Sequence, residues 1–244
     1  MEVVDGPAPG HPEIYRVVAD NPGPMTLTGT NTWLFGSDPC WVIDPGPDDS
    51  RHLAAVGEAI EERGGAAGAL LTHSHNDHSG GCGRLGVDLA PVTDGRRFGR
   101  LTAVATPGHA IDHFCFFSDD GVCFSGDLIL GWGSTYVPPD GGSLAAYIDS
   151  LRLVESLGPD LICPGHGPFV TDPAARISEY REHREARERG LIIALDRGER
   201  SRMALLDEVW SDVPGQLRPA AAVVMESHLQ KLEAEGLLPP DLGE

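Results

Sequence analysis

The amino-acid sequence predicts an α/β fold that is followed by a small helical module. In the first two thirds of the chain, short apolar segments of strand length alternate with loops and a few amphipathic helices. A dense group of histidines directly follows one buried strand, and an α/β scaffold displays its chemistry in such loops. From Asp172 onward the pattern is helical only. We therefore expect a catalytic domain at residues 1–189 and a helical module at residues 190–244.

The first elements have clear boundaries in the sequence. Residues 32–35 and 40–43 are typical of a hairpin that ends in a turn rich in proline and glycine. A helix is expected at residues 50–63, because its apolar residues share one face and two glycines end it. Residues 69–72 then predict a buried strand that leads into the histidine group.

The later elements continue this alternation. We expect further strands at residues 101–106, 113–118, 121–125 and 161–163. Ser143 is a good N-cap for an amphipathic helix that Gly158 ends. Asp172 and Pro173 form a cap and first-turn pair for the next helix, and Pro219 is expected to begin a final helix that ends at Gly236.

Composition indicates a soluble globular protein. Of the 244 residues, 41% are hydrophobic and 23% are charged, which is ordinary for such a protein. The N-terminal region lacks the pattern of a signal peptide, and no window reaches the roughly 18 to 20 apolar residues of a membrane span. We expect a cytoplasmic protein without a membrane partner. The five cysteines are odd in number and scattered, which predicts reduced thiols.

The charge balance is strongly acidic. The formal net charge is −19, and such a surface repels nucleic acid at long range. The exception is the segment 176–202, which carries eight arginines against six carboxylates. We interpret it as a solvated helix with opposite charges four residues apart.

Seven residues have side chains suited to a divalent cation: His73, His75, Asp77, His78, His109, Asp127 and His166. His73 and His75 are two residues apart, so on extended backbone they project the same way and can chelate one ion. Asp77 and His78 come after a turn has begun, so they can face a second position close by. A role in core packing does not explain so many polar groups directly after a buried strand, because burying polar groups that have no partners costs free energy. The remaining single histidines are interpreted as surface or core residues: His11, His52, His113, His183 and His228.

These motifs resemble the signature of the metallo-β-lactamase superfamily. The matching stretches, in the family's order, are residues 44–46, 72–81, 106–109, 125–127 and 164–167. The resemblance implies a four-layer αβ/βα sandwich with the metals at one edge. It also implies that a first ion is held by His73, His75 and His109. A second ion would be held by Asp77, His78 and His166, and the carboxylate of Asp127 would bridge the two.

The resemblance further implies a binuclear hydrolase. We expect two Zn²⁺ ions, with Mn²⁺ or Fe²⁺ as alternatives, since histidine and carboxylate ligands accept all three. A hydroxide shared by the two ions would attack an electrophilic carbonyl or phosphorus. Asp77 would both bind metal and handle a proton. Asp44 and Thr72 are the candidates for orienting the ligand histidines, a support that metal sites usually need.

Other segments resemble more closely the β-lactamase-like protein 2 group, which includes a single-strand endoribonuclease. They comprise residues 21–32, 139–141, 182–184 and 227–237, and the last of these resembles part of a winged-helix module. A helical cap or dimerisation element is the alternative for that module. Asn31 and Thr32, on a loop near the metals, are candidate substrate contacts. Trp132 is another, because it could stack on a base, although it could equally be an ordinary half-buried tryptophan.

Several functions remain open from the sequence. The leading hypothesis is hydrolysis of phosphodiester bonds in single-stranded RNA. The alternatives are a thioester or lactone hydrolase similar to glyoxalase II, a persulfide dioxygenase with one iron, and a winged-helix regulator with a vestigial sandwich. A true antibiotic β-lactamase is disfavoured, because those enzymes lack the carboxylate that Asp127 supplies. The expected partner is a small ester or thioester, or single-stranded RNA, and a homodimer is a further possibility.

Overall fold

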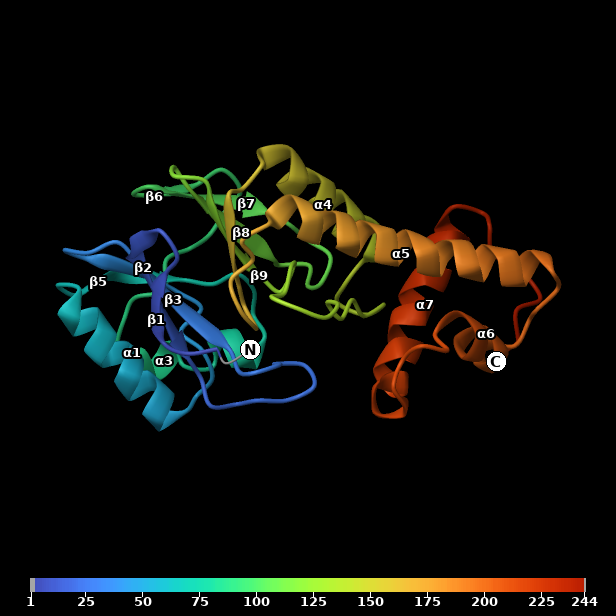
Figure 1. Cartoon of the computed structure of the whole chain (residues 1–244), viewed down its shortest axis with the longest axis horizontal. Coiled ribbons are helices and arrows are strands. Elements are labelled where there is room, and N and C mark those ends of the chain that lie inside the picture. The colour runs from blue at the N-terminus through green and yellow to red at the C-terminus, as the bar shows by residue number, and fades with distance from the viewer. Residues whose placement is uncertain (1–2, 244) are drawn as a thin grey trace.

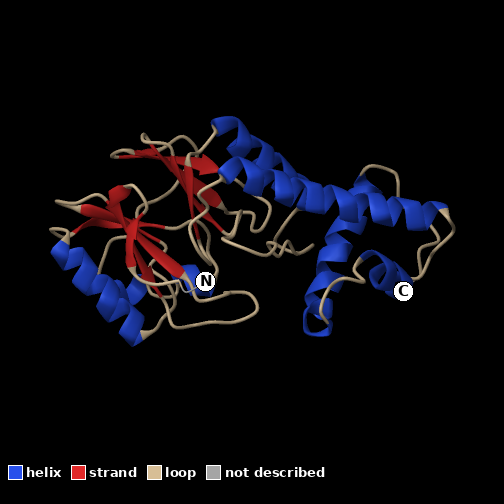
Figure 2. Cartoon of the chain, viewed as in Figure 1, coloured by secondary structure: helices blue, strands red, loops and turns tan. Residues whose placement is uncertain are grey.

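The computed structural model describes residues 3–243 and consists of a two-sheet sandwich followed by a helical C-terminal part. Figure 1 shows helices on the outer faces of the two sheets, and the last helices extend beyond the sandwich to one side. Figure 2 shows the strands gathered in the sandwich and helices in the C-terminal part. This arrangement confirms the α/β fold with a helical C-terminal module.

The first sheet contains five strands in sequence order. They are β1 (Gly6–Ala8), β2 (His11–Val18), β3 (Asn31–Phe35), β4 (Cys40–Ile43) and β5 (Ala66–Leu70). β3 and β4 pair antiparallel as the expected hairpin, whereas β4 and β5 are parallel. Helix α1 (Ser50–Glu62) makes the crossover between them, and the Asp49 side chain caps it by accepting a hydrogen bond from His52 N. The expected hairpin and helix are therefore confirmed.

The second sheet also contains five strands. Their order is β10 (Leu161–Pro164), β9 (Val122–Gly126), β8 (Phe114–Ser118), β7 (Leu101–Ala105) and β6 (Arg97–Phe98). β9 and β10 are parallel, and α4 (Leu144–Leu157) connects them. Ser143 caps α4 by accepting from Ala146 N, and Gly158 ends the helix at φ +59°, as its sequence predicted.

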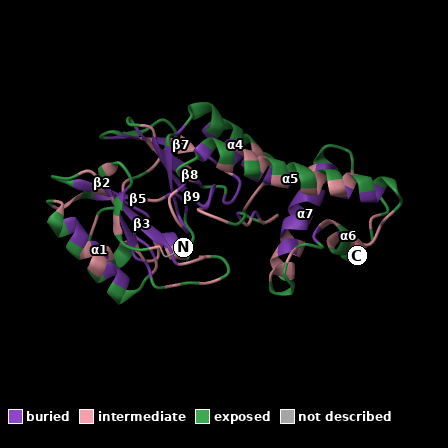
Figure 3. Ribbon diagram, viewed as in Figure 1, coloured by how far each residue is buried: buried purple, intermediate pink, exposed green. Residues whose placement is uncertain are grey.

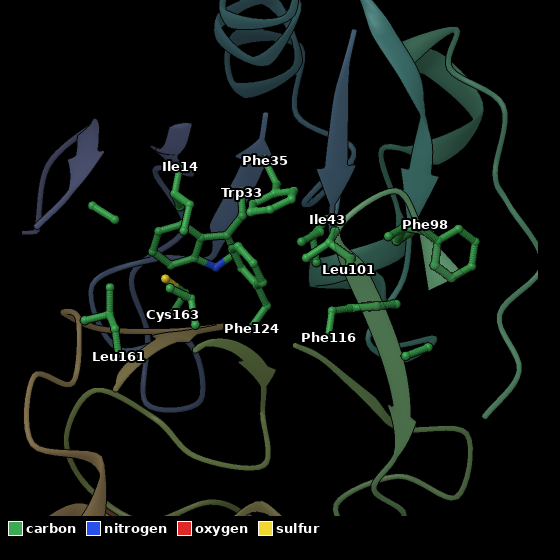
Figure 4. Close-up of a cluster of buried hydrophobic side chains, with 14 residues drawn as sticks. Ile14, Trp33, Phe35, Ile43, Phe98, Leu101, Phe116, Phe124, Leu161 and Cys163 are labelled. Carbon is green, nitrogen blue, oxygen red and sulfur yellow. The ribbon is translucent and has the colours of Figure 1, made fainter. Parts of the chain in front are cut away.

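Large apolar side chains from both sheets fill the space between them (Figure 4). Trp33 and Phe35 of the first sheet meet Phe124 of the second edge to face, with ring centroids 6.0 and 5.9 Å apart. On the outer faces, α1 packs against the first sheet, while α4 and α5 (Pro173–Asp196) pack against the second. The sandwich therefore has the four layers expected from the sequence.

The C-terminal helices have a hydrophobic core of their own. Helix α5 is followed by α6 (Arg202–Val209), the 3₁₀ turn η1 (Gly215–Leu217) and α7 (Arg218–Ala234). Leu191 and Leu195 of α5 pack with Leu205 and Leu229, and this core begins close to the boundary expected at residue 190. That boundary lies inside α5, so one continuous helix serves both parts. Between residues 197 and 243 the structure describes helices and turns, without the strand pair of a wing.

Burial follows the layers of the fold (Figure 3). β3 and β9 are buried along their whole length, whereas α1 and α5 have exposed outer faces. None of the helices within residues 3–243 is long and apolar enough to cross a membrane. The five cysteines are free thiols, as expected.

Candidate metal centre

The fold brings all seven predicted metal ligands together at one end of the sandwich. The group from His73 to His78 follows β5 and continues into the short helix α2 (Asn76–Ser79). His109 comes after β7, Asp127 directly after β9, and His166 two residues after the end of β10. Segments far apart in the sequence thus meet because neighbouring strands end at this edge of the two sheets.

Three imidazoles form a first group of possible ligands. The facing nitrogens of His73, His75 and His109 lie within 4.8 Å of one another. His73 Nε2 is 2.9 Å from His75 Nδ1, and His109 Nε2 is 3.0 Å from the same atom. Three nitrogens that converge on one point offer the ligand set of a zinc ion.

A second group lies beside the first. The ligand atoms of Asp77, His78 and His166 also lie within 4.8 Å of one another, with His166 Nε2 3.2 Å from Asp77 Oδ2. Asp127 Oδ1 faces this group, at 3.4 Å from His166 Nε2 and 3.5 Å from His78 Nε2. Asp127 Oδ2 lies 3.7 Å from His109 Nε2 in the first group. The two oxygens of this carboxylate therefore point to different groups.

The outer nitrogen of most of these imidazoles is held by the protein. His109 Nδ1 lies 2.6 Å from the carbonyl oxygen of Tyr136, and His166 Nδ1 lies 3.2 Å from that of Gly29. His73 Nδ1 is 3.0 Å from Thr72 Oγ1. Such contacts fix the ring orientation and aim the inner nitrogen at the centre.

Asp44 and Thr72, the predicted supporting pair, are buried behind the centre and contact each other. Asp44 Oδ1 accepts a hydrogen bond from Thr72 N at 2.7 Å, and Oδ2 accepts one from Thr72 Oγ1 at 2.7 Å. Asp44 Oδ2 also lies 2.9 Å from His78 Nδ1. The carboxylate thereby links ligands from both groups, because Thr72 in turn contacts His73.

Burial and mutual proximity determine the charges of the centre. Burial, reinforced by His78, lowers the pKa of His73 far below its usual value, so this ring is neutral. Burial alone would lower the pKa of His166, but Asp127 and Asp77 outweigh it and raise the pKa to about 9. Burial would raise the pKa of Asp127, but His166 and His78 hold it well below its usual value. A bound cation would take the place of protons in such a cluster.

The residues fit a bound metal. His78 Nε2, His166 Nε2 and Asp127 Oδ1 are buried, face one another and make no hydrogen bond within residues 3–243. Unpaired buried polar atoms are costly, and a cation would satisfy all three. Gly165 keeps the space free, because a Cβ atom there would lie 2.5 Å from Asp127 Oδ1 and 2.7 Å from His78 Cε1. The cluster is therefore suited to bind a divalent metal.

The structure corrects the expected position of Asn31 and Thr32. Both lie in β3 rather than on a loop, and both are fully buried. Asn31 Nδ2 donates to the carbonyl oxygens of Pro164 and Gly167, at 2.9 Å each. Thr32 Oγ1 donates to the carbonyl oxygen of Asp44 at 2.7 Å. These side chains hold the backbone on either side of His166 and at Asp44. Neither lines the cavity beside the centre, so the predicted contact with substrate stays a prediction without support from the structure.

Trp132, the third candidate substrate contact, is half-buried in the loop after β9. It does not line the cavity beside the centre, which has a volume of about 210 Å³. That cavity is lined by four candidate ligands and seven other residues: His75, Asp77, His109 and Asp127, with Pro24, Met25, Leu27, Leu130, Ser134, Thr135 and Tyr136. Stacking on Trp132 therefore stays a prediction without support from the cavity.

Sequence reasoning missed His113 and the apolar wall of the cavity. His113 is buried behind the centre, with Nδ1 2.9 Å from Thr106 Oγ1 and Nε2 accepting a hydrogen bond from Asp127 N at 3.2 Å. Burial and His109 lower its pKa to about 3, so the ring is neutral and can accept that bond. Met25 and Leu27 come from a long loop, where a single apolar residue gives no periodic signal.

Comparisons with known proteins agree with this geometry. The profile of the metallo-beta-lactamase superfamily matches residues 87–166. The chain is 31% identical to the beta-lactamase-like protein 2 homolog of Drosophila melanogaster, over 92% of this chain and 89% of that protein. It is 35% identical to the atrochrysone carboxyl ACP thioesterase of Aspergillus chevalieri, over 75% of this chain and 66% of that protein.

A solved structure shows the same fold. It is a metallo-beta-lactamase family protein from Thermus thermophilus, which matches with a TM-score of 0.76 at 22% identity and covers 93% of this chain and 95% of its own. Its match includes the C-terminal helices, because it extends over nearly the whole length of both chains. The chain therefore belongs to the metallo-β-lactamase superfamily and is a hydrolase of that superfamily.

Proposed function

We propose that this hydrolase cleaves a thioester or ester of an apolar carboxylic acid, with two zinc ions bound at the centre. The observation that carries the proposal is the wall of the cavity beside the centre, where Pro24, Met25, Leu27 and Leu130 gather. Among residues 3–243, neither lysine nor arginine lines this cavity. An apolar acyl group suits such a wall, whereas the backbone of a nucleic acid is bound mainly by cationic side chains.

The proposal keeps the ligand sets that the resemblance to the superfamily implies. His73, His75 and His109 would hold one ion, and Asp77, His78 and His166 the other, with Asp127 between them. When bound, the ions supply Lewis acidity and an activated water. The side chain of Asp77 is 29% exposed, against 10% for Asp127, so it is the carboxylate that substrate reaches. We assign to an oxygen of Asp77 the role of accepting the proton that the attacking water would release and of passing it to the departing thiolate or alkoxide.

The thioesterase among the relatives supports this substrate class, since it is 35% identical over 75% of this chain. RNA cleavage, the leading expectation from the sequence, stays as the second candidate because it rests on likeness to the β-lactamase-like protein 2 group, and that likeness extends over 92% of the chain. Two of the arginines nearby do not favour it, because they are already paired. Arg176 pairs with Glu179 and Arg187 with Asp212, so these cations are already neutralised.

A thioester assay tests the proposal directly. Zinc-loaded protein is mixed with hexanoyl-N-acetylcysteamine, and the released thiol is measured. We expect turnover that falls at least about a hundredfold in Asp127→Asn, because a ligand and its charge are lost. Asp119→Asn is the matched control, because Asp119 is an exposed partner of Arg97. If the thioester stays intact while single-stranded RNA is cut by the wild type and not by Asp127→Asn, the substrate is a phosphodiester.

Metal analysis of the purified protein is the companion measurement. Two zinc ions per chain agree with the proposal, and one iron per chain would favour the persulfide dioxygenase alternative instead. A cytoplasmic location, a homodimer and the division at residue 190 also remain predictions from the sequence.

A further inference from the structure

A groove continues from the cavity at the metal centre toward the C-terminal helices. It has a volume of about 180 Å³. Both spaces are lined by the same short segments, namely Pro24, Met25, Ser134, Thr135 and Tyr136. The opposite wall of the groove comes from the C-terminal part of the chain and includes Trp210, Val213, Ala221 and Val224. A molecule whose reacting carbonyl lies at the centre can therefore extend into this groove.

Arg184 of α5 lines the groove and is a buried cation that has no counterion within the part of the chain that the structure describes. Its side chain is fully enclosed, and the residue is 2% exposed. One guanidinium nitrogen, Nη2, donates to the carbonyl oxygen of Thr135, and the guanidinium carbon lies 5.3 Å from the ring centroid of Tyr147. Nε has no hydrogen-bond partner, and no carboxylate among residues 3–243 lies within 4.0 Å of the guanidinium nitrogens.

An isolated buried charge needs an explanation, because removing a guanidinium from water without a paired anion is strongly unfavourable. The neighbouring arginine differs in this respect. Arg187 also lines the groove, but both of its terminal nitrogens bind the carboxylate of Asp212 at 2.8 Å. Of these two arginines, the one without a paired carboxylate among residues 3–243 is therefore the more deeply enclosed, in a protein whose net charge is −19. A ligand that brings its own anion would complete this arrangement.

We infer that the groove binds an anionic group of the substrate, a carboxylate or a phosphate, through Arg184 while the reacting carbonyl lies at the metal centre. The inference rests on the proposed function and narrows its substrate class. The substrate would carry an oxyanion at a distance from the bond that is cleaved, on either the acyl or the thiol side. The apolar wall formed by Trp210, Val213, Ala221 and Val224 would contact the chain between the two ends.

Pairs of thioesters that differ by one anionic group test the inference and identify the side on which the anion lies. Adipoyl- and hexanoyl-N-acetylcysteamine differ on the acyl side, and hexanoyl-4′-phosphopantetheine and hexanoyl-pantetheine differ on the thiol side. For the wild type we expect kcat/KM to be roughly ten- to a hundredfold higher for the anionic member of one pair, as is usual for a hydrogen bond to a charged group. In Arg184→Met this ratio should fall to about one.

Two further variants keep the test decisive. Arg189→Met removes an exposed arginine of the same helix that pairs with Glu185, and it should leave the ratio unchanged. Ala220→Glu places a carboxylate on the wall of the groove and should lower kcat/KM for the anionic member selectively, even if Arg184→Met fails to fold. If all four thioesters are hydrolysed and the ratio of kcat/KM between the anionic and the neutral member is the same in the wild type and in every variant, the inference is overturned. The proposed function would still stand. Absence of any thioester hydrolysis would overturn the proposed function itself.

Discussion

The Nδ1 atom of His109 lies 2.6 Å from the carbonyl oxygen of Tyr136, and the two neighbouring carbonyls are held by C-terminal helices. Arg184 of α5 donates to Thr135 O, and Ser227 of α7 donates to Val137 O at 2.7 Å. Three successive carbonyls thus join one candidate metal ligand to two helices. The C-terminal part therefore contributes to the position of His109 as well as to the groove.

Ser227→Ala should weaken metal binding without removing any ligand. The loss of the bond to Val137 O should destabilise the fold by about 1 kcal/mol and lower zinc affinity by up to about tenfold, because the support of a ligand histidine is loosened. Competition with a chromophoric chelator measures the affinity. Ser156→Ala is the matched control, because Ser156 Oγ donates to Leu153 O on the exposed face of α4. Equal zinc affinity in the two variants would show that α7 does not act on His109.

Asp44→Asn should reduce metal affinity more strongly. In the wild type, both oxygens of Asp44 accept hydrogen bonds from Thr72, and Oδ2 faces His78 Nδ1. An amide in this place turns one acceptor into a donor, so one of these contacts becomes donor against donor. We expect zinc affinity to fall by about ten- to a hundredfold. Asp48→Asn, at an exposed partner of Arg84, should leave it unchanged, and the same loss in both variants would contradict the assigned role.

Asn31→Ala distinguishes a structural role from substrate contact. The carbonyl of Gly167 would lose its donor in a buried place, whereas that of Pro164 would keep the hydrogen bond from Trp33 Nε1 at 3.2 Å. We expect the free energy of unfolding of the metal-free protein to fall by about 1–3 kcal/mol in urea denaturation, with a further loss of zinc affinity through His166. A variant with unchanged stability and a raised KM would restore the role in substrate binding that the sequence suggested.

The alternation of strands and helices and the seven candidate ligands were predictable from the sequence, because these features depend on local signals. The four-layer sandwich was implied by the resemblance to the metallo-β-lactamase superfamily. Strand alternation, helix caps and closely spaced histidines are all visible within short windows. Strands β1 and β2 were missed since β2 begins with His11, Pro12 and Glu13, which give no alternating pattern. Asn31 and Thr32 were placed on a loop instead of in β3 for a different reason. Whether Asn31 faces a cavity or the backbone around His166 depends on a partner 133 residues away, and no local pattern reports such a contact.

The pH dependence of stability should report on His228, which lies in the core of the C-terminal part. Its side chain is fully buried, and its ring lies 5.8 Å from that of Trp210. Neither ring nitrogen has a hydrogen-bond partner among the described residues. Burial, followed by the charges of Arg184, His183, Lys231 and Arg187, holds the pKa of His228 well below its usual value. The carboxylate of Glu188, 4.0 Å away, pairs with Lys231 instead.

The sign of the effect follows from proton binding. Below a pH of about 6.5 the unfolded chain protonates this histidine, whereas the folded protein keeps it neutral, so stability falls as the solution is acidified. Over that window one such group contributes a slope of up to about 1.4 kcal/mol per pH unit. In His228→Leu we expect the decline of the unfolding free energy between about pH 6.5 and pH 5 to be shallower by up to this amount. His11→Leu, in β2, serves as the control, and equal slopes in both variants would mean that His228 is protonated in the folded protein.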